Sequence, residues 1–206
     1  MSTSPRWKSG WALLLFLFIL STPLKNSAYT EFIIRVLILN DVKASFRADS
    51  FKSIYIKGVP TQQRIVKSIR IIHSKGQTKY STDKTNGKVF TLPENFKLII
   101  KNNDKRGIWL GKRRYAGELR VSMKNNKLQV INHIGIDKYL RSVVGSEMPK
   151  EFPLAALQAQ AVASRTYAMQ LLDKKRDFDI KSTQDSQVYL GLESETPITR
   201  KAVRST

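Results

Sequence analysis

The sequence predicts an α+β protein, in which a β-rich N-terminal part is followed by a mixed domain built around one alanine-rich helix. Two observations carry this prediction. Short clusters of branched apolar residues, separated by turn-forming residues, fill positions 31 to 110. A long segment of Ala, Leu and Gln with helical spacing then begins near residue 153. Because the strand signals come first and the main helix signal follows them, the order of elements indicates the α+β class.

The β-rich region contains five apolar clusters, and we interpret each of them as a strand. They span residues 33–39, 54–56, 69–72, 88–90 and 98–100, with turn-forming residues at 57–60, 74–77, 85–88 and 101–104. Asn86-Gly87 between two extended runs is a hairpin signal. This region is therefore predicted to be a small, mostly antiparallel β unit with a basic exterior.

Residues 115–136 are expected to continue in strands. The segment 124–127, Lys-Asn-Asn-Lys, predicts a turn between the apolar runs that flank it. Gly117 allows a close backbone approach or a bend. Asp137 is expected to be the N-cap of a short helical segment that reaches Val144.

The alanine-rich helix is predicted from about Pro153 to Asp173. One stripe at helical spacing contains Leu154, Leu157, Ala161, Ser164, Ala168 and Leu171-Leu172. The many alanines make this helix slim, so a neighbouring backbone or a polymeric ligand can approach it closely. Further along, Thr196-Pro197 reads as an N-cap followed by proline in the first turn, which predicts another helix.

The N-terminal 28 residues are expected to be a signal peptide. Arg6 and Lys8 precede a ten-residue apolar run at 11–20, which is too short for a membrane span of roughly 20 residues. Ala28 offers a small residue at a cleavage point. An uncleaved anchor that includes residues 12–24 is the second interpretation, and a buried core helix is the third. Export to the periplasm, cell envelope or extracellular space is the expectation.

Composition limits both the size of the core and the kind of partner. The 206 residues, 41% of them hydrophobic, suffice for one ordinary core or one core with a small appended domain. No cysteine is present, which excludes disulfides and thiolate metal sites. The net charge is +20, and a chain cut after Ala28 keeps a net charge of +17. Such a charge attracts polyanions, or it is an ordinary solvated basic surface. Export argues against nucleic acid as the natural partner.

Glu147 stands out because it lies at a forced bend beside a helix start. Met148-Pro149 follows it, and Pro153 suits a first helical turn. The surrounding motifs extend well beyond this bend. They are Tyr115-Ala-Gly-Glu-Leu-Arg-Val121, Leu128-Gln-Val-Ile-Asn132, Tyr139-Leu140, Val143-Val144, Ser146-Glu147-Met148-Pro149, Ala159-Gln-Ala-Val-Ala163, Arg165-Thr-Tyr-Ala168 and Ser182-Thr-Gln-Asp-Ser-Gln-Val-Tyr-Leu-Gly191.

In this order, the motifs resemble the catalytic core of the stage II sporulation protein D / amidase-enhancer LytB family over roughly residues 100–195. The resemblance implies action on bacterial peptidoglycan. Together with the N-terminal features, it divides the chain into a signal peptide or N-terminal anchor 1–28, a basic β-rich region 29–110 and a SpoIID/LytB-like domain 111–206. Members of the family continue beyond the equivalent of residue 206, so the domain is expected to be incomplete.

The resemblance implies that Glu147 is the catalytic acid/base of a lytic transglycosylase. Such enzymes use one carboxyl group to protonate the leaving glycosidic oxygen and then to activate the muramic 6-hydroxyl, whereas ordinary glycosidases need two carboxylates. The chemistry requires partial shielding of the glutamate from water. The alternative is a structural role, in which Glu147 caps the helix at Pro153 or pairs with a lysine.

Seven further residues are candidates for binding a saccharide. Arg165 could orient Glu147 or bind a sugar carbonyl or lactyl carboxylate, and its alternative is an ordinary surface arginine. Gln160 is a second candidate on the same helix. Tyr167, also on this helix, is expected either to contact sugar or to pack in the core. The polar segment 182–189 supplies Asp185, Ser186 and Gln187, with Tyr189 as a stacking platform; the alternative is a self-stabilised polar turn. Asp185 could also act as a second carboxylate, which would permit hydrolysis.

No metal or other cofactor is expected. His73 and His133 lie 60 positions apart, and two histidines do not complete a zinc shell. Some members of the family have a Cys/His zinc site near the segment that matches residues 181–187, and this chain lacks those ligands. It also has Ser142, Ala155 and Gln158 where glycine, an acid and lysine are usual.

Two function classes follow from the sequence. The first is an exported protein that cleaves peptidoglycan glycan strands with Glu147. The second is a non-catalytic peptidoglycan-binding protein that enhances a cell-wall amidase. A basic nucleic-acid-binding β module is a third possibility, but the chain lacks the interleaved aromatic residues of RNA-stacking surfaces and begins with an export signal.

Overall fold

The computed structural model describes residues 31–50, 52–60, 64–102 and 104–206. The predicted signal segment 1–28 lies outside these ranges. Residues Glu31–Thr206 form one compact unit. Within the described ranges, no helix is long and apolar enough to cross a membrane.

A seven-stranded sheet contains strands from both halves of the chain. Its order is β13 (Ile180–Lys181), β1 (Ile33–Asp41), β12 (Lys127–Gly135), β11 (Glu118–Lys124), β8 (Leu98–Lys101), β3 (Ile54–Lys57) and β4 (Ile65–Val66). Neighbouring strands are antiparallel except β1 and β13, which are parallel. Since this sheet joins segments before and after residue 110, the predicted boundary there does not separate two compact units.

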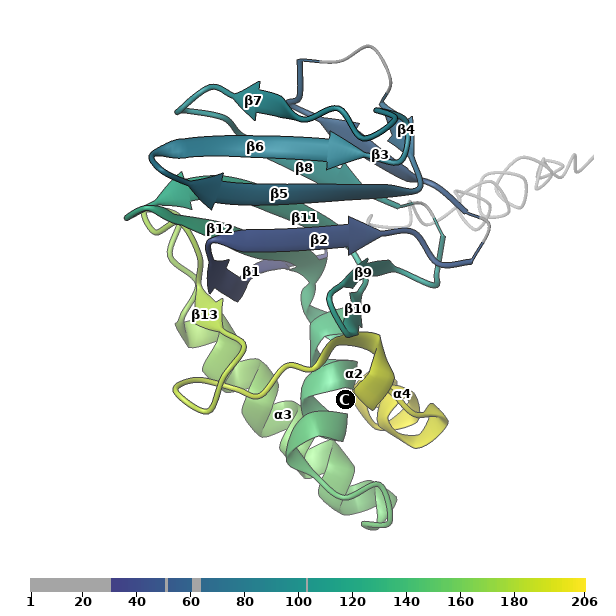
Figure 1. Ribbon diagram of the computed structural model, residues 1–206. Helices are drawn as coiled ribbons and strands as arrows, with labels where there is room; N and C mark the ends of the chain where they lie inside the picture. Colours follow the sequence, from purple (N-terminus) through teal and green to yellow (C-terminus); the bar gives the residue numbers. More distant parts are fainter. Residues whose placement is uncertain (1–30, 51, 61–63, 103) are drawn as a thin grey trace, which may run out of the picture. The chain divides into compact units, whose positions relative to one another are not determined.

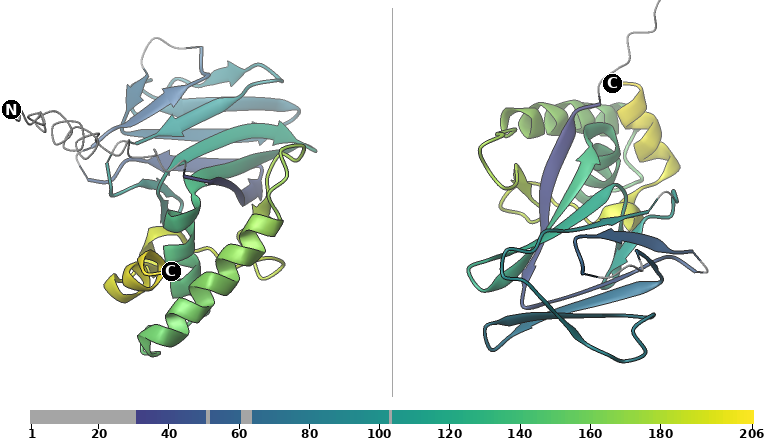
Figure 2. Two further views of the ribbon diagram at one scale, coloured as in Figure 1. Left: turned by 180° about the vertical axis from the view of Figure 1, so that it is seen from behind. Right: turned by 90° about the horizontal axis from the view of Figure 1, so that it is seen from above.

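A second sheet has six antiparallel strands and faces the first (Figures 1 and 2). Its order is β10 (Arg113–Tyr115), β9 (Ile108–Leu110), β2 (Lys43–Arg47), β5 (Ser68–Ser74), β6 (Gln77–Thr82) and β7 (Phe90–Leu92). Burial alternates along many of the strands, as in β2, where Ala44 and Phe46 are buried and their neighbours are exposed. The inward-facing residues of both sheets belong to one hydrophobic core.

The turns follow the residues that predict them. Asn125 and Asn126, between β11 and β12, have φ angles of 50° and 58°. Both central residues of a tight hairpin need positive φ, and asparagine tolerates it better than most residues. Asn86 and Gly87 also have positive φ, so the predicted turn is confirmed, although the connection from β6 to β7 spans residues 83–89.

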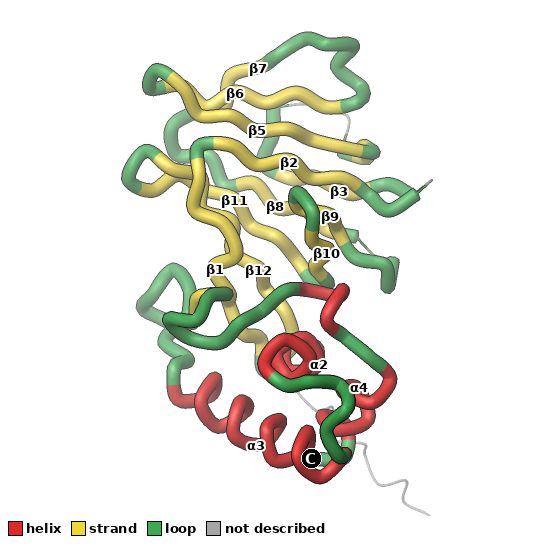
Figure 3. Tube along the Cα trace, turned by 60° about the horizontal axis from the view of Figure 1, so that its bottom comes forward, coloured by secondary structure: helices red, strands yellow, loops and turns green. Residues whose placement is uncertain are grey.

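Three α-helices and a short 3₁₀ helix lie together at one end of the sheets (Figures 1 and 3). They are α2 (Ile136–Glu147), α3 (Leu154–Gln170), η1 (Gly191–Ser194) and α4 (Pro197–Arg204). The α+β class is thereby confirmed. The alanine-rich helix α3 begins one residue later and ends three residues earlier than predicted. The helix predicted at Thr196 is confirmed, because the Thr196 side chain caps α4 in a capping box with Thr199.

The predicted N-cap of α2 is wrong. Gly135 occupies the N-cap position and makes no side-chain cap, while Asp137 lies inside the first turn. Strand β12 runs directly into α2, so no loop residue is present to supply a capping side chain. Asp137 instead accepts a hydrogen bond from Arg165 of α3 at 3.3 Å.

Candidate functional site

Glu147 lies at the C-terminal end of α2 because the apolar stripe of that helix stops there. Five residues of the stripe are buried against the sheet and the other helices: Ile136, Tyr139, Leu140, Val143 and Val144. Met148 is extended, and Pro149 cannot continue the helix. The predicted bend is therefore confirmed, and the Glu147 side chain is exposed beside it.

The Glu147 carboxylate is bonded to the polar segment 182–189. Its Oε1 accepts a hydrogen bond of 2.6 Å from the backbone N–H of Val188. Backbone bonds close this segment into a compact loop, from Tyr189 N to Ser182 O at 3.3 Å and from Ser186 N to Thr183 O at 3.0 Å. Two motifs that are 41 positions apart in the sequence thus meet at one place.

Within this loop, Gln187 faces the interior. Tyr139 of α2 donates its hydroxyl hydrogen to Gln187 Oε1 at 3.0 Å, and Gln187 Nε2 donates to the Ser164 carbonyl of α3 at 3.4 Å. Only 8% of the residue is exposed. The prediction that Gln187 contacts a saccharide is corrected, since its amide already joins α2 to α3.

The prediction of Tyr189 as a stacking platform for sugar is wrong. The residue is 1% exposed, and its ring packs against Tyr115 and Tyr139 with centroid distances of 5.6 and 5.1 Å. Its hydroxyl donates to Asn132 Oδ1 at 2.8 Å. Burial raises the pKa of Tyr189 well above its ordinary value. Neither face of the ring is free for a ligand.

The other two polar candidates of the loop remain accessible. Asp185 is exposed, and one of its carboxylate oxygens lies 3.1 Å from Lys181 Nζ. Ser186 is half-buried, and its Oγ accepts a hydrogen bond from Lys181 N at 3.4 Å. Both residues lie in the loop whose Val188 N–H binds Glu147. Their roles in saccharide binding stay predictions.

Arg165 lies away from Glu147. Its Nη2 donates to Asp137 Oδ1 at 3.3 Å and to the Val203 carbonyl at 3.2 Å. The guanidinium thus joins α3 to the first turn of α2 and to the last turn of α4, whereas Glu147 ends α2 at its other terminus. The predicted role of orienting Glu147 is corrected to one of holding three helices together.

The last two candidates on α3 differ in their surroundings. Gln160 is half-buried, and its Nε2 donates to Ser164 Oγ at 3.1 Å, so it contacts the same serine residue as Gln187. Tyr167 is 39% exposed, so the core-packing alternative for Tyr167 is wrong. Exposed Ala159 and Ala163 lie on the same helix, which leaves part of its slim surface accessible.

A buried ion pair anchors the chain just before the loop. Asp179 accepts hydrogen bonds from Arg35 N at 2.8 Å, Arg35 Nη2 at 2.6 Å and Asp173 N at 3.1 Å. Burial alone would raise the pKa of Asp179, but the bonds from Arg35 and Asp173 hold it below the ordinary value. Strand β13 follows at once, so this pair fixes where the Glu147-binding loop begins.

The histidines do not share a site. His73 lies in β5 and bonds through Nδ1 to Thr78 Oγ1 at 3.0 Å, while His133 lies in β12 of the other sheet. Burial and the nearby Arg120 lower the pKa of His133 to about 4. Across the described ranges, no group of three or more His, Cys, Asp or Glu side chains is arranged to hold a metal ion.

A basic cleft lies beside the first half of α2, and sequence reasoning missed it. Its volume is about 770 Å³, and its walls include Lys105, Lys138 and Arg141. These residues come from separate segments whose meeting no sequence spacing reveals. Glu147 does not line this cleft.

Comparison with known proteins gives the family of the C-terminal segment. Residues 124–206 match the family described as stage II sporulation protein, SpoIID. This segment is thus similar to the SpoIID domain family. The predicted resemblance is thereby confirmed for this segment, which contains α2, the Glu147-binding loop and α4. The match supports a cell-wall-related function.

One curated relative aligns with about half of the chain. It is an uncharacterized protein of Brachyspira hyodysenteriae, 38% identical over 112 residues, which are 53% of this chain and 30% of the relative. The chain thus spans less than a third of the length of that relative. No solved structure matches.

Proposed function

We propose that the protein is exported and binds peptidoglycan glycan strands, which its SpoIID domain cleaves with Glu147 as the acid/base, in the manner of a lytic transglycosylase. The observation that supports this most is the 2.6 Å bond from Val188 N to Glu147 Oε1. It fixes one carboxylate oxygen beside an accessible polar loop. Among the described residues, Oε2 has no hydrogen-bond partner and is left for a ligand.

In this proposal the Glu147 carboxyl group transfers a proton twice. It first protonates the glycosidic oxygen that leaves the muramic acid, and it then accepts the proton of the muramic 6-hydroxyl as that oxygen attacks the anomeric carbon. The product is a 1,6-anhydro sugar, and no water is consumed. Since Glu147 is exposed in the free protein, the bound strand itself must exclude water from Oε2.

The test of this proposal is the formation of anhydro-muramyl ends from purified glycan strands. We expect Glu147→Gln to reduce their formation by about 100-fold, which is typical for the loss of a general acid or base. Glu151→Gln is the matched control, because Glu151 is an exposed glutamate just beyond the bend at Pro149, and among the described residues its one ion pair joins it to Lys150 at 3.9 Å. If the wild-type protein forms no anhydro ends, the catalytic proposal fails.

The second candidate function is non-catalytic binding to the cell wall with enhancement of an amidase. The exposure of Glu147 and the net charge of +20 favour it. Binding to purified sacculi should then weaken as salt rises, because screening shortens the reach of surface charges. Glu147→Gln should bind as the wild type does and should stimulate an amidase equally well. If Glu147→Gln loses the stimulation of the amidase, this alternative is contradicted.

A further inference from the structure

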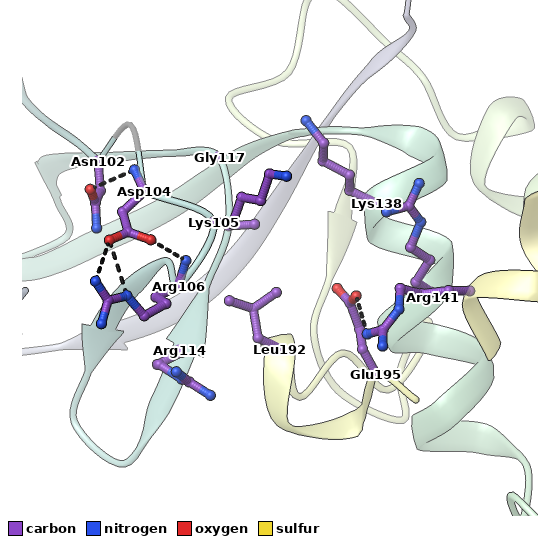
Figure 4. A pocket seen from close by; sticks show the side chains of 12 residues that line it. Asn102, Asp104, Lys105, Arg106, Arg114, Gly117, Lys138, Arg141, Leu192 and Glu195 are labelled. Atoms are coloured by element: carbon purple, nitrogen blue, oxygen red, sulfur yellow. Dashed lines mark hydrogen bonds and ion pairs between the residues drawn. The ribbon is translucent and has the colours of Figure 1, made fainter. Parts of the chain in front are cut away.

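The basic cleft lies between the segment 104–106, the first half of α2, η1 and the start of α4 (Figure 4). Six basic residues line it: Lys105, Arg106, Arg114, Lys138, Arg141 and Arg200. Among the described residues, only two acidic ones, Asp104 and Glu195, share the lining. The cleft therefore has a large excess of positive charge, concentrated between walls of protein.

Three of the six cations are neutralised by ion pairs. Arg106 Nη2 lies 2.9 Å from Asp104 Oδ2. Arg114 Nε lies 2.7 Å from Glu193 Oε1, and Arg200 Nη1 lies 3.7 Å from Glu195 Oε2. These pairs stiffen the walls of the cleft and use all the acidic residues that line it.

The other three cations have no ion pair within the described part of the chain. Lys105 lies on one side of the cleft, and Lys138 and Arg141 of α2 lie on the other (Figure 4). Lys138 lies in the first turn of α2, where the helix dipole adds further positive potential. Arg141 also has a buried Nε that finds no hydrogen-bond acceptor among the described residues.

The unpartnered Arg141 is the feature that points to a ligand. Arg141 lines the cleft and has no ion pair within the described part of the chain, so its guanidinium can pair with an acidic ligand that enters the cleft. Glu195, an acid close enough to Arg141 to interact with it, is 10% exposed at its side chain and already pairs with Arg200. Burial raises the pKa of Glu195, although the nearby Arg141 and Arg200 oppose this rise. A raised pKa disfavours the charged carboxylate, so Glu195 is a weak counter-charge for Arg141.

We infer that this cleft binds a polymer bearing repeated phosphate groups, with Lys105 on one wall and Lys138 and Arg141 on the other contacting its oxygens. Lysines bind phosphate as point charges, and the arginine fork supplies directed donors. Cations on both walls fit a ligand with several acidic groups better than a single carboxylate. The site is separate from Glu147, which lies at the far end of α2.

The test measures binding of a linear polyphosphate chain to the purified protein at low salt by titration calorimetry. We expect Lys138→Gln/Arg141→Gln to weaken this binding by about tenfold. Lys43→Gln/Lys79→Gln is the charge-matched control, since both lysines are exposed on the six-stranded sheet and lie outside the cleft. Unchanged thermal unfolding of both variants shows that the fold is retained. Equal weakening in the two variants would overturn the inference and leave only a diffuse basic surface.

Two further arms separate this inference from others. Polyglutamate should bind at least tenfold more weakly than polyphosphate; equal binding would overturn the assignment to phosphate. Glu147→Gln should bind polyphosphate as the wild type does, because Glu147 does not line the cleft. Loss of polyphosphate binding in Glu147→Gln would overturn the inference that the two sites are separate. If the wild-type protein binds polyphosphate but does not cleave glycan strands, the proposed function fails and the inference about the cleft stands.

Discussion

Replacing Tyr189 with alanine is expected to lower the free energy of unfolding by about 4 kcal/mol, the range for removing a fully buried aromatic side chain. Tyr189 is the central ring of a cluster with Tyr115 and Tyr139, and its hydroxyl is bonded to Asn132. These contacts join β10, β12 and α2 to the end of the Glu147-binding loop. A cavity there would loosen the sheet, the helix and the loop together.

Urea unfolding measures this effect, and Tyr189→Phe is its control. The phenylalanine keeps the packing and loses only the bond to Asn132, so about 1 kcal/mol is expected. If Tyr189→Ala instead unfolds at the same urea concentration as the wild type but binds glycan strands more weakly, Tyr189 acts as a platform for sugar and the structural role is contradicted.

The parts of the fold that depend on local sequence could be predicted. The branched apolar clusters predicted β1, β3, β5 and β8, and the cluster 88–90 overlaps β7 at Phe90. Asn125-Asn126 predicted the turn between β11 and β12, and Asn86-Gly87 predicted a turn before β7, because strand and turn preferences act between near neighbours. The bend after Glu147 was equally local, since proline limits the backbone whatever surrounds it.

The partners of the site residues could not be predicted, because they depend on which segments meet. Tyr189 and Gln187 lie in a loop without periodicity, so the sequence does not tell which side chains point inward. Arg165 lies on a helix whose face is readable, but its partners Asp137 and Val203 come from other helices. Glu147 was found from its bend, whereas its bond to Val188 required the fold.

The basic cleft illustrates the same limit for charge. Lys105 precedes β9, and Lys138 and Arg141 follow β12, more than 30 positions later. Only the sheet brings these segments to one place. In the sequence, nothing distinguishes these three residues from the other 33 lysines and arginines. The sequence alone therefore does not show which of the basic residues lie together.

The second large effect is expected from Asp179→Ala, which should destabilise the fold by about 3 kcal/mol at pH 7. Asp179 is 5% exposed and receives bonds from Arg35 and from Asp173 N. Removing it leaves the partly buried Arg35 guanidinium without its counter-charge, which is a costly kind of substitution. Asp177→Ala is the matched control, because Asp177 is exposed and, within the described ranges, pairs only with the exposed Lys124; less than about 1 kcal/mol is expected.

The pH dependence of this difference distinguishes charge from packing. The pKa of Asp179 is lowered in the folded state, so its contribution is fully present above the unfolded pKa of about 3.9. That contribution is lost as the pH falls through the lower, folded pKa. Urea unfolding of the wild type and Asp179→Ala should therefore differ most near pH 7 and converge below about pH 4. A difference that stays constant into acid would mean that the side chain contributes by packing alone. Because Asp179 fixes the start of the loop that holds Glu147, the variant should also lose the proposed glycan cleavage under conditions where it remains folded.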